Sequence, residues 1–230
     1  MILQRFGLLV PIVPALGNLE VSPANLYIPE SITEKDKTLT NEWLYAPLVA
    51  TIWSPTFRNE AARKAFRRGG FYSRELTPNW RVIILNSNTP AKANWWNLYG
   101  GKDADGQLAW LVSELQAAET AGQYVTITGH VPPKSEYMID VWLHNYIRIV
   151  DRFQHVITGT YFGHTHKDEL VVLYNKEKKP VSVAFVSGSI SPYGGVNPMY
   201  SIFEIDGQTG TMIAWLWNTH VYHTSWIDDY

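Results

Sequence analysis

The order of its apolar patterns constrains the fold of this chain more than any other feature. From residue 42 to residue 166, segments with the apolar spacing of a helix alternate with short apolar runs typical of buried strands. After residue 168 only strand-type segments follow, joined by turns such as Asp206-Gly207. This order predicts an α/β (α+β) fold in which a two-sheet β-sandwich is flanked by helices.

The individual elements are predicted from these spacings and from flanking glycines and prolines. The clearest helix ends before Gly122, which suits a left-handed C-cap, and its apolar face carries Leu108, Leu111, Val112, Leu115 and Ala118. Further helices are predicted over residues 42–51, 59–68 and 140–153. Strands are predicted over residues 8–13, 81–85, 124–128, 155–162, 169–174, 181–186, 200–205 and 212–217. Residues 22–40 and 88–106 are predicted to be loops.

The length permits one large domain or two small ones, and we predict a single domain over residues 1–230. Hydrophobic residues make up 46% of the chain and charged residues 17%, which argues against disorder. The formal net charge is −2 and no basic stripe stands out, so we predict that no nucleic-acid polymer is a partner. The absence of cysteine excludes disulfides and thiolate metal sites.

Two features bear on membranes and export. The sequence has no run of about 18 apolar residues, so we predict no transmembrane segment. The apolar residues 6–16 are interrupted by Pro11 and Pro14. We interpret this segment as a buried strand that leads into a loop, rather than as a signal peptide.

Histidines gather in short motifs that begin with glycine at predicted strand ends. Of seven histidines, three lie in Gly129-His130 and in Gly163-His164-Thr165-His166. In a strand-like run, positions i and i+2 point to the same side, so His164 and His166 can share a cavity. Imidazole suits zinc, iron or manganese, and the amide oxygen of Asn18, in Gly17-Asn18, is an acceptable further ligand. These residues could instead be unrelated polar groups at strand ends, but together they favour a metal site.

The same motifs resemble the last three of the five sequence motifs of the calcineurin-like metallophosphoesterases. The resemblance runs through nearly the whole chain and is specific for the acid sphingomyelinase branch. Its carriers are Pro14-Ala-Leu-Gly-Asn18, Gly69-Gly-Phe-Tyr72, Gln107-Leu-Ala-Trp-Leu111, Glu114-Leu-Gln-Ala-Ala-Glu119, Gly129-His-Val-Pro-Pro133, Asn145-Tyr-Ile-Arg-Ile-Val150, Tyr161-Phe-Gly-His-Thr-His-Lys-Asp-Glu169 and Tyr193-Gly-Gly-Val-Asn-Pro198.

The resemblance implies a metal-dependent phosphodiester hydrolase in which two ions, usually zinc, clamp the substrate. Asn18, His130 and His164 would then bind one ion and His166 the other. Tyr193 would lie near the substrate phosphate, although it could equally be a turn aromatic that packs on the sheet. The implied substrate is sphingomyelin, cleaved to ceramide and phosphocholine, or a nucleotide-like phosphodiester. The family also implies a secreted or lysosomal location and contact with a membrane surface.

The chain departs from the family pattern in three ways. The first two motifs, which include an Asp that bridges both metals, have no counterpart here, so we expect an incomplete domain whose N-terminal part is missing. Leu19 stands where the family has a His that assists the leaving group. Two loops that commonly carry cysteine lack it. We therefore expect at most one weak zinc site and impaired hydrolysis.

Two other interpretations remain open. The chain could be a non-catalytic relative that binds a lipid, a nucleotide or a protein partner. In either case a two-sheet core that lacks one end exposes apolar strand edges, which predicts marginal solubility or oligomerisation.

Overall fold

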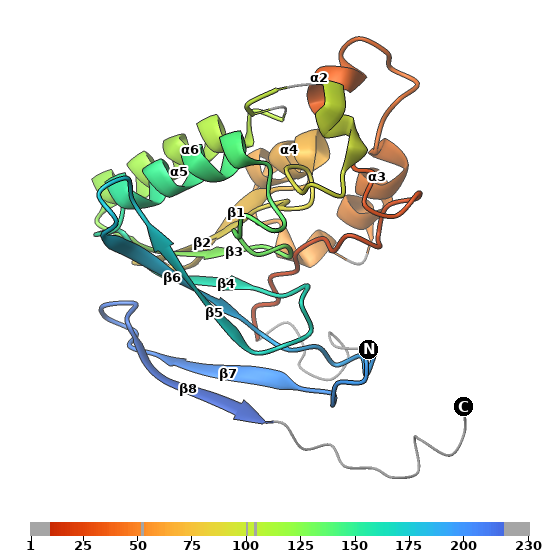
Figure 1. The fold of residues 1–230 in the computed structure, drawn as a ribbon. Coiled ribbons are helices and arrows are strands. Elements are labelled where there is room, and N and C mark those ends of the chain that lie inside the picture. Colours follow the sequence, from red (N-terminus) through yellow and green to blue (C-terminus); the bar gives the residue numbers. More distant parts are fainter. Residues whose placement is uncertain (1–9, 52, 100, 104, 219–230) are drawn as a thin grey trace.

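A mixed six-stranded sheet forms the centre of the computed structural model, which describes residues 10–51, 53–99, 101–103 and 105–218 (Figure 1). Its strand order is β1-β2-β3-β4-β6-β5. The bounds are β1 Tyr72–Thr77, β2 Trp80–Ile84, β3 Tyr124–Thr128, β4 Ile157–Phe162, β5 Glu169–Tyr174 and β6 Pro180–Val186. A second sheet pairs β7 (Tyr200–Ile205) with β8 (Met212–Asn218).

The four middle strands of the large sheet are parallel. β2 pairs with β3, β3 with β4, and β4 with β6, whereas β1 and β5 lie antiparallel at the two edges. Parallel strands need crossover connections, and helices of the predicted type supply the first two of them. As a result, the carboxyl ends of four neighbouring strands meet at one edge of the sheet.

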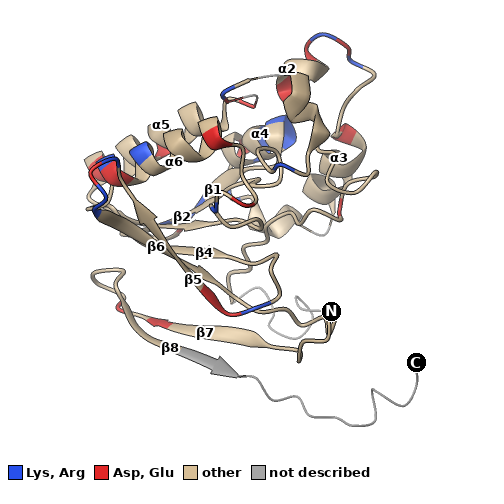
Figure 2. Cartoon of the chain, in the orientation of Figure 1, with Lys and Arg blue, Asp and Glu red and all other residues tan. Residues whose placement is uncertain are grey.

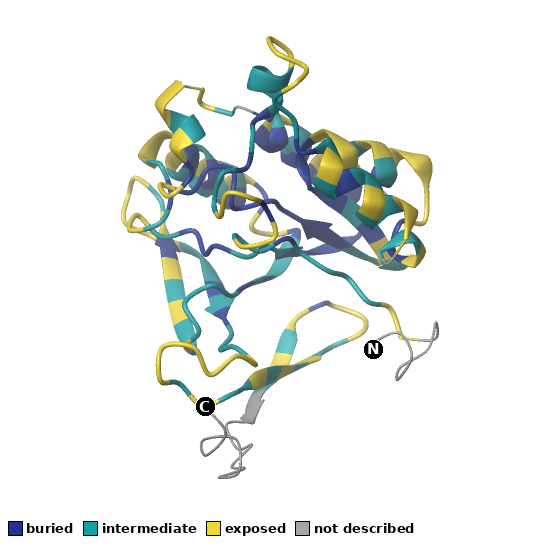
Figure 3. Ribbon diagram, turned by 90° about the vertical axis from the view of Figure 1, so that its right-hand side faces the viewer, coloured by how far each residue is buried: buried dark blue, intermediate teal, exposed yellow. Residues whose placement is uncertain are grey.

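Two long helices cover one face of this sheet (Figure 1). They are α5 (Gln107–Ala121) and α6 (Asp140–Arg152). The apolar stripe predicted on α5 packs against the inward side chains of β2 and β3, among them Ile83 and Ile127. Figure 3 shows the consequence, with buried residues along the strands and exposed residues on the outer sides of the helices.

The other face of the sheet has two covers. At the β1–β2 end lie α3 (Glu42–Ala50) and α4 (Glu60–Gly69), which pack on Val82 and Ile84. At the other end lies the β7–β8 sheet, joined to the large sheet by aromatic contacts among Tyr161, Phe185, Phe203 and Trp215. The chain therefore has the predicted α/β class, with two stacked sheets flanked by helices.

Three features of the fold differ from the predictions. The predicted strand over residues 8–13 lies partly outside the described residues, and residues 10–13 form no strand. Pro11 cannot donate a ladder hydrogen bond, and the carbonyl of Ile12 is bound instead by side chains of Thr56 and Arg74. β1 was not predicted, and two loops contain short helices: α2 (Glu30–Thr33) and the 3₁₀ helix η2 (Trp95–Tyr99).

The surface charges are mixed in sign. Figure 2 shows Lys and Arg interspersed with Asp and Glu over the helices and loops. Among the described residues, no helix is both long and apolar enough to cross a membrane.

Candidate metal centre

The candidate residues lie at the carboxyl-terminal edge of the parallel strands. His130 follows β3 after one glycine, and His164 follows β4 in the same way. Asn18 arrives from the long N-terminal segment, in the turn that follows Leu16. In open α/β sheets this edge is where ligands bind, because loops from neighbouring strands converge there.

The segment that carries Asn18 is anchored by hydrogen bonds to Leu16 and Gly17, the two residues before Asn18. The Tyr27 hydroxyl donates to the carbonyl of Gly17 at 2.6 Å. The buried side-chain amide of Asn88 donates to the carbonyl of Leu16 at 2.8 Å. The backbone therefore enters the site in a fixed direction even though this segment belongs to no strand.

His130 is held through its main chain. Its N–H donates to Ser87 Oγ at 2.9 Å, and its carbonyl accepts from the N–H of Gly163 at 2.9 Å. Gly129 is required at the strand end because a Cβ there would lie 2.9 Å from Ser87 Oγ and 3.0 Å from the Phe162 ring. These contacts tie the β2, β3 and β4 ends together around the imidazole.

Three potential ligand atoms converge at this point. The distance from His130 Nε2 to Asn18 Oδ1 is 2.8 Å, and the distance from His130 Nε2 to His164 Nδ1 is 3.2 Å. The two imidazole rings meet edge to face at 5.0 Å, and Tyr137 packs edge to face on His164 at 5.4 Å. Asn18, His130 and His164, which the sequence predicted to share one ion, are thus brought together.

The environment favours the neutral form of both imidazoles. The pKa of His130 is lowered to about 4, first by burial and then by the neighbouring His164 and His166. The pKa of His164 is lowered by burial and by His166. A neutral imidazole presents a free lone pair, which is the form that binds a metal ion.

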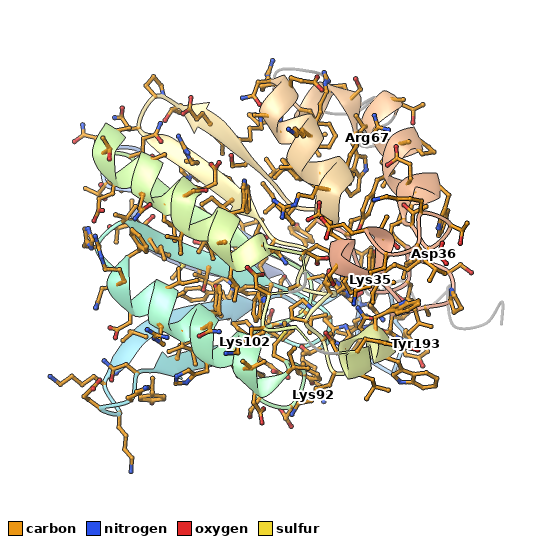
Figure 4. All side chains as sticks on the ribbon, turned by 90° about the horizontal axis from the view of Figure 1, so that it is seen from above. Lys35, Asp36, Arg67, Lys92, Lys102 and Tyr193 are labelled. Carbon is orange, nitrogen blue, oxygen red and sulfur yellow. The ribbon has the colours of Figure 1, made fainter. Side chains whose placement is uncertain are left out.

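His166 and Tyr193 lie beside this group rather than in it. His164 and His166 both have a left-handed backbone, with φ of 75° and 61°, so the expected strand-like run is replaced by a tight turn. His166 Nδ1 faces the carbonyl oxygen of Tyr193 at 3.4 Å, and the two rings are 6.0 Å apart. The side chain of Tyr193 is 79% exposed, and it is labelled in Figure 4 together with Lys92 and Lys102.

The donor set fits one divalent ion and supplies no negative charge. Ligand atoms about 2.0–2.1 Å from a tetrahedral zinc are about 3.3 Å from one another. The distance from His130 Nε2 to His164 Nδ1 matches this at 3.2 Å, and that from His130 Nε2 to Asn18 Oδ1 is shorter at 2.8 Å. Across the described residues, no three His, Cys, Asp or Glu side chains come close enough to hold an ion. An ion here would therefore depend on two imidazoles and an amide oxygen.

Sequence reasoning missed the supporting residues Ser87, Asn88 and Asn25. Each acts through hydrogen bonds to a residue that is distant in the sequence or lies across a turn, and no motif spacing predicts such contacts. Leu19, next to the candidate ligand Asn18, is 73% exposed and contributes no polar atom to the group.

Comparisons with known proteins indicate the family of the chain. No family model matches the chain. It is 43% identical over 200 residues to a sphingomyelin phosphodiesterase of Bos taurus and 42% identical over 200 residues to one of Homo sapiens, with 86% of this chain and 31% of each relative aligned. A human cyclic GMP-AMP phosphodiesterase is 34% identical over 173 residues, which are 69% of this chain and 38% of that protein.

These alignments concern part of each relative. The chain spans about a third of the length of the curated relatives it matches, with 31% of the bovine and human proteins covered. A solved dimetal phosphatase from Danio rerio superimposes with a TM-score of 0.45 and 11% identity, covering 63% of this chain and 56% of that chain.

Proposed function

We propose, because this chain belongs to the acid sphingomyelinase-like metallophosphoesterases, that it is a metal-dependent phosphodiester hydrolase acting on sphingomyelin. The observation that supports this most directly is the convergence of Asn18 Oδ1, His130 Nε2 and His164 Nδ1 at the carboxyl edge of the sheet. The products would be ceramide and phosphocholine. A secreted or lysosomal location is proposed on the same ground.

Each residue has a role in this proposal. Asn18, His130 and His164 would hold one ion, and zinc suits their nitrogen and oxygen atoms. When bound, the ion would neutralise negative charge on the phosphodiester. His166 would bind the second ion, and the exposed Tyr193 hydroxyl would donate a hydrogen bond to the phosphate.

Catalysis is expected to be slow in this form. No carboxylate joins the ligand group within the described part of the chain, so the ion's charge is poorly compensated. Leu19 can neither donate a proton nor carry charge. The competing proposal, a non-catalytic relative that binds a phosphodiester, is favoured by these same two observations.

A membrane surface is the proposed second partner, because a lipid substrate lies in one. Trp95, Leu98 and Tyr99 of η2 are 70%, 86% and 75% exposed, and Trp and Tyr favour the membrane–water interface. Lys102, which follows η2 in the sequence, would meet lipid phosphates, whereas the Lys92 ammonium donates to the carbonyl of Ser135 and pairs with Asp140 (Figure 4).

The loop that presents η2 is tied to the candidate site. Asn94, buried at the base of η2, donates to the carbonyl of Tyr27, and the Tyr27 hydroxyl binds Gly17 beside the candidate ligand Asn18. A lipid surface seated on η2 would therefore approach the Asn18 segment.

The test is the release of phosphocholine from sphingomyelin vesicles with and without zinc. Hydrolysis of bis(p-nitrophenyl) phosphate serves as the soluble counterpart. Zinc-dependent turnover that His130→Ala abolishes is the expected result. His144→Ala is the matched control, since His144 is exposed on α6 and should leave turnover unchanged.

Two other outcomes would decide against this function. Zinc binding that depends on His130, without turnover of either substrate, would favour the non-catalytic proposal. Turnover of a cyclic dinucleotide but not of sphingomyelin would keep the reaction class and replace the substrate.

A further inference from the structure

The orientation of the Asn18 amide decides whether this side chain can act as a ligand. An amide presents an oxygen at one end and an NH₂ group at the other, and only the oxygen can bind a cation. In the structure, Asn18 Oδ1 faces His130 Nε2 at 2.8 Å, while Asn18 Nδ2 donates to Asn25 Oδ1 at 3.0 Å. The partner of the NH₂ group thus sets the direction of the oxygen.

Asn25 is itself fixed by the turn that it closes. Its N–H donates to the carbonyl of Asn18 at 2.8 Å, and its own carbonyl accepts from the N–H of Tyr27 at 3.0 Å. Its φ of 68° lies in the left-handed region, where Asn is tolerated far better than most side chains. The backbone and the side chain of Asn25 therefore both form hydrogen bonds with Asn18.

We infer that Asn25 is a positioning residue that holds the Asn18 amide with its oxygen toward the metal site. This inference rests on the proposed function, since it gives Asn18 a role as a ligand. Without the acceptor on Asn25, the Asn18 amide can turn over and present NH₂ to the ion. Loss of such an outer hydrogen bond typically weakens metal affinity 10–100-fold.

Two substitutions separate the side chain of Asn25 from its backbone conformation. Asn25→Gly removes the acceptor and leaves the left-handed conformation unstrained, because glycine adopts positive φ freely. Asn25→Asp keeps an oxygen at the same position and also tolerates the left-handed region. Lys178→Gly is the matched control, since Lys178 has a φ of 60° in the turn between β5 and β6.

The experiment is titration of the full chain with Zn²⁺ by calorimetry and with Co²⁺ by visible absorption. Thermal unfolding without metal is recorded for each variant. The expected result is a 10–100-fold weaker affinity in Asn25→Gly, with an unchanged unfolding midpoint. Asn25→Asp should bind at least as tightly as the wild type, and Lys178→Gly should match the wild type.

Several results would overturn the inference. Equal affinity of Asn25→Gly and wild type would do so while leaving the proposed function intact. An affinity loss that accompanies a lowered unfolding midpoint in Asn25→Gly would also do so, because the role of Asn25 would then be structural. A wild type that binds no more metal than His130→Ala would reject both the inference and the proposed metal site.

Discussion

At the scale of single residues, Leu19 lies beside the candidate ligand Asn18 without a packing role that would require an apolar side chain. It is 73% exposed, so replacing it should change stability little. The family resemblance places a histidine there. We therefore predict that Leu19→His raises kcat for the soluble phosphodiester, with an upper range of about 10²–10⁴-fold for general-acid assistance.

Steady-state kinetics with saturating zinc measures this change. Leu98→His, at another strongly exposed leucine, is the control that should leave kcat unchanged. An equal kcat in Leu19→His and wild type would contradict an acid role for this position.

Asp105 offers a pH dependence that is separate from the metal site. Its carboxyl is buried and accepts the N–H of Glu30 at 2.9 Å. Burial raises the pKa of Asp105 to about 7, and the nearby Asp103 and Glu30 add to the rise, against hydrogen bonds from Glu30 and Thr89. The folded state therefore keeps a proton on Asp105 that the unfolded chain has already lost.

Stability should consequently fall as the pH rises. The loss begins near pH 4, where the unfolded carboxyl ionises, and is complete above about pH 7. The contribution is on the order of 4 kcal/mol, from about 1.4 kcal/mol for each pKa unit. Urea unfolding at a series of pH values should show this slope in the wild type and a flatter profile in Asp105→Asn. Parallel profiles would show that Asp105 does not titrate in this way.

His130 and His164 were predictable because each follows a glycine at the end of a parallel strand, and parallel strand ends meet at one edge of the sheet. Asn18 also follows a glycine, but no strand precedes it, so its place beside the two histidines depends on the tertiary fold. The direction of His166 was not predictable, because it depends on a turn in which both His164 and His166 are left-handed. The role of Asn25 could not be predicted from the sequence either, because it depends on the orientation of the Asn18 side-chain amide.

At the scale of single elements, the end of α5 gives a clean test of the predicted C-cap. Gly122 has a φ of 65°, and a Cβ there would meet no atom within 4 Å, so only the backbone conformation opposes a side chain. Gly122→Ala should lower the free energy of unfolding by about 1 kcal/mol. Gly207→Ala is the control, because a Cβ at Gly207 also meets nothing and its φ is not positive. Equal unfolding midpoints in urea would contradict the cap.

The short helix η2 gives a prediction about binding. Trp95→Ser combined with Leu98→Ser should weaken association with sphingomyelin-containing vesicles about 10-fold or more, since two large exposed apolar side chains are lost. Vesicle sedimentation measures the change. Trp43→Ser, at an exposed tryptophan on α3, is the control expected to bind normally. Unchanged binding of the double variant would place the membrane contact elsewhere.

The bounds of strands were predicted well where the apolar pattern of the sequence is uninterrupted. The bounds of β3, β5 and β7 were predicted to the residue, and each is bounded by turn or loop residues. β1 was not predicted from the sequence because Ser73, Arg74 and Glu75 interrupt its apolar residues. Arg74 is nevertheless buried and donates to the Ile12 carbonyl, a contact that only the tertiary fold provides.

At the scale of the whole molecule, the second sheet covers only part of the large one. Phe185 of β6 packs on Phe203 and Trp215, but Leu170 and Val172 of the edge strand β5 remain 56% and 39% exposed. Leu170 is paired with Phe185, so it points to the same face as the aromatic contacts. Within the described residues, no element covers this part of the face.

An uncovered apolar stripe on an edge strand favours association with a second chain. We therefore predict self-association that depends on concentration, and we expect Leu170→Lys to suppress it by placing a charge in the stripe. Sedimentation velocity over a range of protein concentrations measures both. Val141→Lys is the matched control, since Val141 is 40% exposed on α6, away from the strand edge, and should leave the association unchanged. A wild type that stays monomeric throughout would show that this face needs no partner, which would contradict the oligomerisation expected from the sequence.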